Sequence, residues 1–217
     1  MTAKLLRNLL LAVAIAVPAA IVVPAGTASA TTLAPLSLEQ LTDASEYVIH
    51  GMVTEVWTEI DDAGLVWTRA RVDVAETLKG PDSPNELIID SLGGDYEGYV
   101  LKVPSRARYS VHEELYTFLT RTDDGRLIPV AKFLGKFIVR RAPGDTESYL
   151  RTWHGSDKGI AYDGRFLPHP KSDDRLYMND FLERVQARLD TGWDGKAIPG
   201  MATDRLPALN TPDRRKQ

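Results

Sequence analysis

The order of the sequence segments predicts a mainly β protein with one helix before the strands and one after them. Two long alternating segments joined by a turn predict a β-hairpin, and further short β-rich segments follow it. Helical spacing of apolar residues occurs only before the first of these segments and after the last. Because helices do not alternate with strands, we expect a small β-barrel or sandwich.

A capping motif marks the start of the first helix. Ser37 is a favourable N-cap residue, and Gln40 stands three positions later, as a capping box requires. We therefore predict a short helix over residues 37–46, after a flexible leader at 31–36.

A long β-hairpin is predicted directly after this helix. Its strands are expected at about 47–60 and 65–78, and Asp61–Gly64 supplies turn-forming residues between them. The apolar face of the first strand changes phase near Thr54 and Glu55. A β-bulge at this point would absorb the change.

The register of the hairpin decides how its two tryptophans lie. If Glu59 pairs with Leu65, Trp57 lies directly opposite Trp67 on the outer face. A four-residue loop in place of a five-residue loop would separate them. We therefore expect an adjacent tryptophan pair.

Two interpretations of this pair are open. Exposed, Trp57 and Trp67 would form a contact site for a protein or a glycan. Alternatively, the C-terminal helix or the segment around Trp153 covers them. We favour the covered arrangement, because that helix must bury its apolar stripe somewhere.

Further β-rich segments complete a predicted domain over residues 37–141. Turn-forming residues separate them, notably in the glycine-rich Gly93–Gly98 and in Asp123–Gly125. The strands are expected at about 86–91, 99–103, 114–120, 126–132 and 136–141.

The chain changes character after this domain. A C-terminal extension is expected at 142–190, irregular at first, with a short hairpin formed by 150–153 and 159–162. Apolar residues at helical spacing then predict a helix at about 174–189. Residues 191–217 are rich in proline, glycine and charge, and we expect a disordered tail there.

The first 30 residues predict export. Lys4 and Arg7 precede an apolar run that ends in small residues, as at a signal-peptidase site. The run is shorter than the roughly 20 apolar residues of a membrane-spanning helix. We therefore expect cleavage between Ala30 and Thr31, no stable membrane anchor afterwards, and a location in the periplasm or outside the cell.

Charge and cysteine content exclude several classes of function. Without the signal peptide, 24 basic residues face 30 acidic ones, a formal charge of −6. Such a protein has no general attraction for nucleic acid or for an anionic membrane. Because the chain has no cysteine, disulfides, thiol nucleophiles and thiolate metal sites are excluded.

A set of short motifs follows in a characteristic order. They are Ser37–Glu46, Tyr47–Val53, Glu76–Gly80, Gly93-Gly94, Glu114–Leu119 and Gly135–Phe137. This order resembles that of a family of small, uncharacterised, exported bacterial proteins. It is similar, more loosely, to the netrin-like domain of the tissue inhibitors of metalloproteinases. The resemblance covers residues 37–141 and implies an OB-like β-barrel, closed or partly open, with the short N-terminal helix. Because the C-terminal helix has an apolar stripe to bury, we expect it to pack on this barrel.

The chain departs from these relatives in three ways. The animal domains have disulfides, and this chain has none. The animal inhibitors chelate the zinc of the protease through an N-terminal cysteine, whereas the expected mature N-terminus here is Thr31, so that mechanism does not carry over. In the bacterial family a glycine often precedes the glutamate of the fourth strand, whereas Glu113 precedes Glu114 here.

The C-terminal extension contains the densest set of candidate metal ligands. They are His154, Asp157, Asp163 and His169. Histidine and carboxylate suit zinc, but the spacing of these residues matches no known site. We therefore predict no metal or cofactor. His50 lies in a predicted strand, where a structural role is expected.

These observations favour a binding protein over an enzyme. The sequence has no nucleophile elbow and no phosphate-binding loop. We expect an exported, non-enzymatic binding or interaction module whose partner is an unknown protein or glycan, bound across strands 2 and 3. One alternative is an exported hydrolase, metal-dependent or not, that uses the C-terminal histidines and aspartates. The other is an inhibitor of an exported protease, which rests on fold analogy alone.

Overall fold

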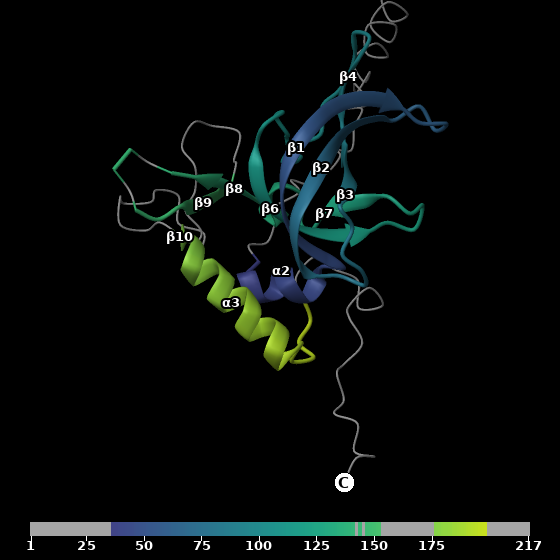
Figure 1. Cartoon of the computed structure of the whole chain (residues 1–217). Helices are drawn as coiled ribbons and strands as arrows, with labels where there is room; N and C mark the ends of the chain where they lie inside the picture. Colours follow the sequence, from purple (N-terminus) through teal and green to yellow (C-terminus); the bar gives the residue numbers. More distant parts are fainter. Residues whose placement is uncertain (1–35, 142, 145, 153–175, 199–217) are drawn as a thin grey trace, which may run out of the picture. The chain divides into compact units, whose positions relative to one another are not determined.

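The structure is a computed structural model that describes residues 36–141, 143–144, 146–152 and 176–198 (Figure 1). The expected signal peptide with its cleavage site at Ala30 and Thr31 lies outside these residues. So do the four candidate metal ligands, His154, Asp157, Asp163 and His169.

The described chain is mainly β, as predicted, with one large antiparallel sheet and two helices (Figure 1). The sheet has the strand order β10-β9-β8-β6-β1-β2-β3, and β7 also pairs with β6. A separate pair, β4 and β5, follows β3 in the chain. The sheet strands are β1 (Tyr47–Ile60), β2 (Val66–Lys79), β3 (Glu86–Leu92), β6 (Glu114–Arg121), β7 (Leu127–Pro129), β8 (Lys136–Arg140), β9 (Tyr149–Thr152) and β10 (Leu176–Tyr177). The other elements are β4 (Gly94–Tyr96), β5 (Tyr99–Leu101), the helices α2 (Leu38–Ala44) and α3 (Met178–Thr191), and a 3₁₀ helix at Lys132–Gly135.

The expected closure of the sheet into a barrel is not found in the described residues. The hydrogen-bonded path ends at β3 on one side and at β10 on the other. β7 approaches β3, with Cα atoms within 8 Å, but no ladder joins the two strands. The established architecture is therefore an antiparallel sheet with two helices.

The capping box at the start of α2 is confirmed. The backbone N–H of Gln40 donates to Oγ of Ser37 at 3.2 Å, and the N–H of Ser37 donates to Oε1 of Gln40 at 2.9 Å. The two reciprocal bonds satisfy backbone donors that the helix itself leaves free. The helix ends at Ala44, two residues earlier than predicted.

The bulge in the hairpin is confirmed, but the predicted register at its turn is wrong. The pairing shifts between Val53 and Glu55, as the change in apolar phase indicated. At the turn, the backbone N–H of Asp61 bonds the carbonyl of Leu65, so the pairs between the bulge and the turn move along β1 relative to the prediction. Trp57 therefore lies opposite Arg69, not Trp67.

Buried apolar residues form two clusters on opposite faces of the sheet. The neighbours Val48 and Ile49 belong to different clusters, as the alternation of a strand requires. One cluster lies under α2 and α3, and it contains the fully buried rings of Phe118, Phe137 and Phe181. The other lies between β1, β2, β3 and β6, and it contains Ile49, Val53, Val72, Ile89, Leu115 and Leu119.

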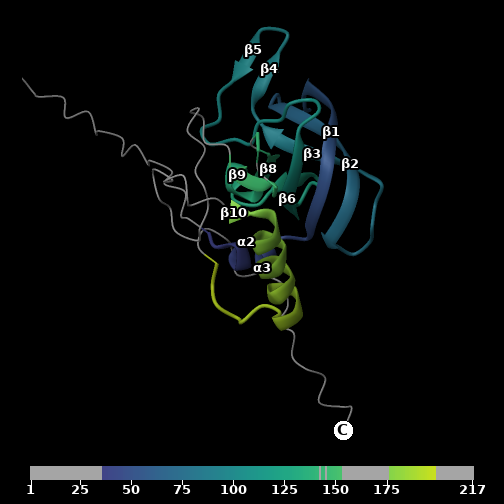
Figure 2. The same cartoon turned by 60° about the vertical axis from the view of Figure 1, so that its left-hand side comes forward.

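The helices lie together against the sheet, away from the turn between β1 and β2 (Figures 1 and 2). Phe181 of α3 contacts Tyr116 and Phe118 of β6, with ring centroids 5.0 and 5.9 Å apart. The apolar stripe of α3 is thus buried on β6 and β8. Helix α3 therefore does not bury its stripe on Trp57 and Trp67, as we expected, and the other expected cover, the segment around Trp153, lies outside the described residues.

The C-terminal part differs from the prediction in three details. β9 pairs with β8 and with β10, whereas its predicted partner, 159–162, lies outside the described residues. Helix α3 begins at Met178, four residues later than predicted. The chain from 192 to 198 continues beyond α3, and Ile198 is only 3% exposed within the first cluster.

Candidate binding face

Two rows of charged side chains cross the outer face of β1, β2 and β3, and an arginine of β2 is at the centre of each. Arg69 Nε lies 3.1 Å from Glu59 Oε1 of β1 and 2.8 Å from Asp90 Oδ1 of β3. Two residues along β2, Arg71 bonds Glu55 of β1 at 2.9 Å and Glu86 of β3 at 2.6 Å. These charged side chains lie on the outer face of the three strands. We call this face the binding face.

Trp57 and Trp67 are both half-buried on this face, but each has its own surroundings. The guanidinium carbon of Arg71 lies 5.5 Å from the ring centroid of Trp57. The indole Nε1 of Trp67 donates to Asp61 Oδ2 at 2.8 Å, and Arg126 lies 4.5 Å above its ring. The aromatic surface is therefore two separate platforms, each with a cation beside it.

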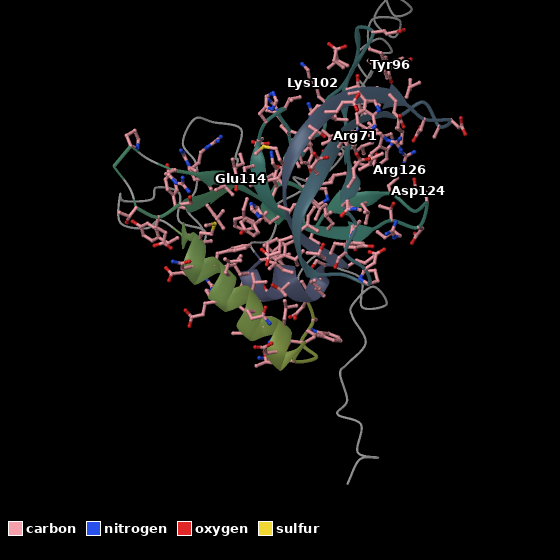
Figure 3. All side chains as sticks on the ribbon, in the orientation of Figure 1. Arg71, Tyr96, Lys102, Glu114, Asp124 and Arg126 are labelled. Carbon is pink, nitrogen blue, oxygen red and sulfur yellow. The ribbon has the colours of Figure 1, made fainter. Side chains whose placement is uncertain are left out.

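Arg126 joins the turn between β6 and β7 to the binding face. Its Nε donates to Asp124 at 2.8 Å, and its terminal nitrogens lie 3.7 Å from Asp61 and 3.8 Å from Asp90. Figure 3 shows Arg126 and Asp124 near the β1–β2 hairpin, on the side where Arg71 lies. One guanidinium thus connects two turns with β3. Sequence reasoning missed this residue, because nothing local indicates which distant acids Arg126 meets.

The carboxylates on this face differ in their environment. The backbone N–H of Leu65 and the indole of Trp67 donate to Asp61, and these bonds lower its pKa. Burial raises the pKa of Asp90, whose side chain is 5% exposed, although Arg69 and Arg126 act in the opposite direction. Asp61 therefore stays ionised at the rim, whereas Asp90 anchors two arginines below it.

Acidic groups outnumber basic ones on the binding face and its turns. Asp73 lies opposite Glu86, so two carboxylates face each other at one end. Each arginine already bonds at least one carboxylate. The residues of these ion pairs and of the Asp73–Glu86 pair are seven acids, Glu55, Glu59, Asp61, Asp73, Glu86, Asp90 and Asp124, and three bases, Arg69, Arg71 and Arg126.

His50 forms a second polar group, where β1 meets β6. Its Nε2 lies 2.8 Å from Glu114 Oε1, and its ring stacks on Tyr116 with centroids 4.4 Å apart. Burial, with smaller contributions from Glu76 and Glu114, raises the pKa of Tyr116 to about 12. The structural role expected for His50 agrees with these contacts. Figure 3 shows Glu114 well separated from Arg71 and Arg126.

A third polar group is buried inside the protein. The Lys136 side chain is 2% exposed, and its ammonium group bonds the carboxylate of Glu113 and the carbonyl of Arg108. It also lies 4.6 Å from the ring of Tyr109, whose hydroxyl has no hydrogen-bond partner among the described residues. Burial lowers the pKa of Lys136 and raises that of Tyr109. These contacts hold the segment before β6 against β8, so their role is structural.

The described residues offer neither a metal site nor a membrane-spanning helix. Within the described ranges, no three His, Asp or Glu side chains are grouped so that they could hold a metal ion. Neither α2 nor α3 is long and apolar enough to cross a membrane. The binding face combines two half-buried indole rings with exposed carboxylates, such as that of Glu55.

A comparison with known protein families finds no matching family, and a comparison with curated proteins finds no matching protein.

Proposed function

We propose that the chain is an exported, non-enzymatic binding module on a partly open OB-type barrel, and that its binding face holds a basic polypeptide segment of a partner protein. The signal-like pattern of residues 1–30 supports export. The meander β1–β2–β3, the pairing of β6 with β1 and the approach of β7 to β3 support the barrel.

The position of the face supports a role in binding. OB-type barrels bind their ligands on the outer face of strands 2 and 3 and with the adjoining loops. Here that region holds Arg69 and Arg71 of β2, the turn at Asp61 and the turn at Asp124. Arg126 links the two turns, so the region is preorganised.

The excess of acid supports a basic partner, and this observation carries the proposal. Glu55 and Glu59 flank Trp57 on β1, and each shares its arginine with an acid of β3. Lysine or arginine side chains of a partner would find carboxylates on both sides and an aromatic ring between them. Phosphate-rich ligands would meet net repulsion instead.

A defined peptide tests this proposal. The mature chain from Thr31 is titrated with the octapeptide (Lys-Val)4, and binding is followed by tryptophan fluorescence. We expect saturable binding that weakens as salt is raised. In the double variant Glu55→Gln/Glu59→Gln we expect about tenfold weaker binding, since each lost charge pair contributes about 0.5–1 kcal/mol.

Two controls make the test specific. Glu183→Gln removes an exposed acid of α3 and should leave the affinity unchanged. Chitohexaose replaces the peptide in a parallel titration. Binding of this neutral sugar without binding of the peptide would overturn the proposal in favour of a glycan partner. Peptide binding that the double variant leaves intact would show that the binding face is not the site.

A further inference from the structure

One side of β1 is open along half of its length. On that side β6 pairs with Tyr47–Met52. The last backbone bonds join Val53 N–H to the Glu113 carbonyl at 3.0 Å and His112 N–H to the Val53 carbonyl at 2.8 Å. From Thr54 to Ile60, β1 pairs with β2 on the other side, and no described strand pairs with the open side.

The alternation of a strand indicates which backbone groups face the open side. The N–H of Asp61 bonds Leu65 across the hairpin, so the odd-numbered residues of this stretch direct their backbone groups to β2. The intervening residues, Val56, Thr58 and Ile60, direct theirs to the open side. No backbone hydrogen bond from these three groups to the described chain is found on that side.

This edge lacks most of the features that protect a free edge. Residues 54–60 contain neither lysine nor proline, and the bulge at Thr54 lies at one end of the stretch. Asp95 of β4 approaches Thr58, but it accepts from the Thr58 side chain, at 2.7 Å, and not from the backbone. The backbone groups of this edge therefore have no strand partner among the described residues, although β4 lies beside β1 with Cα atoms within 8 Å.

Exposed apolar side chains lie at both ends of the edge. Ile60 is 44% exposed at the turn end. Val111, which is 46% exposed, immediately precedes His112, whose N–H bonds Val53 at the other end. An added strand would cover apolar surface at each end as it pairs with the backbone between them.

We propose that β1 takes up an extended segment of the partner as an additional antiparallel strand, with alternating basic and apolar residues. This inference rests on the proposed function, since it assigns how the basic partner is held. The basic side chains lie on the binding face beside Glu55, Trp57 and Glu59. The apolar side chains lie on the other face, beside Val56 and Ile60. An antiparallel strand continues the pattern of every ladder in the sheet.

Charge complementarity selects this occupant over an apolar strand. The side chains of β1 that alternate toward the binding face are acid, aromatic and acid, from Glu55 to Glu59. Residues opposite one another in a sheet share a face and interact directly. Lysine at every second position therefore places a cation opposite each acid and one over the indole of Trp57.

Backbone methylation of the peptide tests the strand pairing. In an antiparallel ladder the partner residues opposite Val56, Thr58 and Ile60 donate to β1, and these are the valines of (Lys-Val)4. N-methylation of all four valines should weaken binding at least tenfold. N-methylation of all four lysines adds the same number of methyl groups with the same charge, and it should change the affinity less than threefold.

A matched pair of protein variants gives an independent test. Thr58→Pro removes the backbone N–H that faces the open side, and it leaves the β1–β2 ladder intact. Thr58→Ala removes the same side-chain bond to Asp95 but keeps the N–H. We expect at least tenfold weaker peptide binding for Thr58→Pro than for Thr58→Ala. Circular dichroism verifies that both variants fold. If the proline variant does not fold, the methylated peptides alone decide whether the partner adds as a strand.

The outcomes separate this inference from the proposed function. If both methylated peptides bind as tightly as (Lys-Val)4, but the Glu55→Gln/Glu59→Gln variant binds weakly, the basic partner is held by side chains alone and strand addition is wrong. If the unmodified peptide does not bind the wild-type chain at all, both proposals are wrong. Selective loss with the valine-methylated peptide and with Thr58→Pro supports strand addition.

Discussion

At the scale of single residues, the described chain contains charged groups that folding has removed from water. Lys136 and Glu113 form one buried ion pair, and Arg188 with Asp43 forms another, at 2.6 Å. Transfer of such a group from water costs several kcal/mol for each ion, and the attraction of the oppositely charged partner offsets this cost. The single residues that matter most for stability are therefore those whose loss leaves a charge unpaired.

Replacement of Lys136 by methionine should strongly destabilise the protein. The carboxylate of Glu113 would remain with 9% of its side chain exposed and without its cation. We expect a loss of about 3–5 kcal/mol in the free energy of unfolding, measured by urea denaturation. The double variant Lys136→Met/Glu113→Leu should recover most of this loss, since it removes both charges. A single variant within about 1 kcal/mol of wild type would show that the pair is not buried as described.

Two tyrosines should resist ionisation at high pH. Burial raises the pKa of Tyr109 well above its usual value and that of Tyr116 to about 12. The pKa of Tyr116 is higher in the folded state than in the unfolded state, so the protonated hydroxyl contributes to the free energy of unfolding. This contribution is present below pH 10.0 and is lost as pH rises toward 12. Phenolate absorbance should therefore show at least two of the eight tyrosines silent until unfolding begins. Ionisation of all eight together near the usual pKa, in folded protein, would contradict this account.

At the scale of elements, α3 is held to the rest of the chain by aromatic packing and by ion pairs. The ring of Phe181 lies 5.5 Å from that of Phe137 and contacts two rings of β6 as well. Arg184 bonds Glu39 of α2 at 2.9 Å, and Arg188 bonds Asp43 just before the end of that helix. The two helices therefore form one layer over the sheet.

Truncation of Phe181 should measure how far the fold depends on α3. The side chain is fully buried, so Phe181→Ala should cost about 3–5 kcal/mol in the free energy of unfolding. Glu183→Ala, two residues away on the exposed side of α3, should change it by less than about 0.5 kcal/mol. Equal effects of the two substitutions on the urea midpoint would mean that α3 is not docked on the sheet.

Features that the residue pattern alone reveals were predicted from the sequence, and a register that depends on the geometry of one side chain was not. The capping box of Ser37 and Gln40 and the bulge at Thr54 involve neighbouring residues, so the pattern revealed them. The hairpin register depends on Asp61, whose Oδ1 accepts from the backbone of Ala63 at 3.0 Å and of Leu65 at 2.9 Å. This side chain places the loop one residue later than predicted, and the tryptophans separate.

At the scale of the whole molecule, the candidate site depends on contacts between residues far apart in the chain. Sequence reasoning named Trp57 and Trp67, and both lie on the binding face. It gave no indication of Arg126, which reaches that face from the turn between β6 and β7. The open side of β1 could not be predicted from the sequence either, because it depends on the point at which β6 stops pairing with β1.

Export is a whole-molecule prediction that mass spectrometry can check. When the full chain is expressed in a bacterium with a general secretion pathway, we expect the secreted or periplasmic form to begin at Thr31. The intact mass should lack residues 1–30, and a variant with Ala30→Arg at the cleavage site should retain them. Recovery of the uncleaved chain from the cytoplasm alone would contradict export.

The most direct test of the central claim is an NMR titration of the indole N–H signals with (Lys-Val)4. The chain has four tryptophans, so each gives one assignable signal. A basic strand on the binding face should shift the signal of Trp57 most and that of Trp67 less. It should not move Trp193, whose Nε1 bonds the Lys196 carbonyl beyond α3. A shift confined to Trp193 or Trp153, or no shift at saturating peptide, would contradict the proposal that the outer face of β1, β2 and β3 is the binding site.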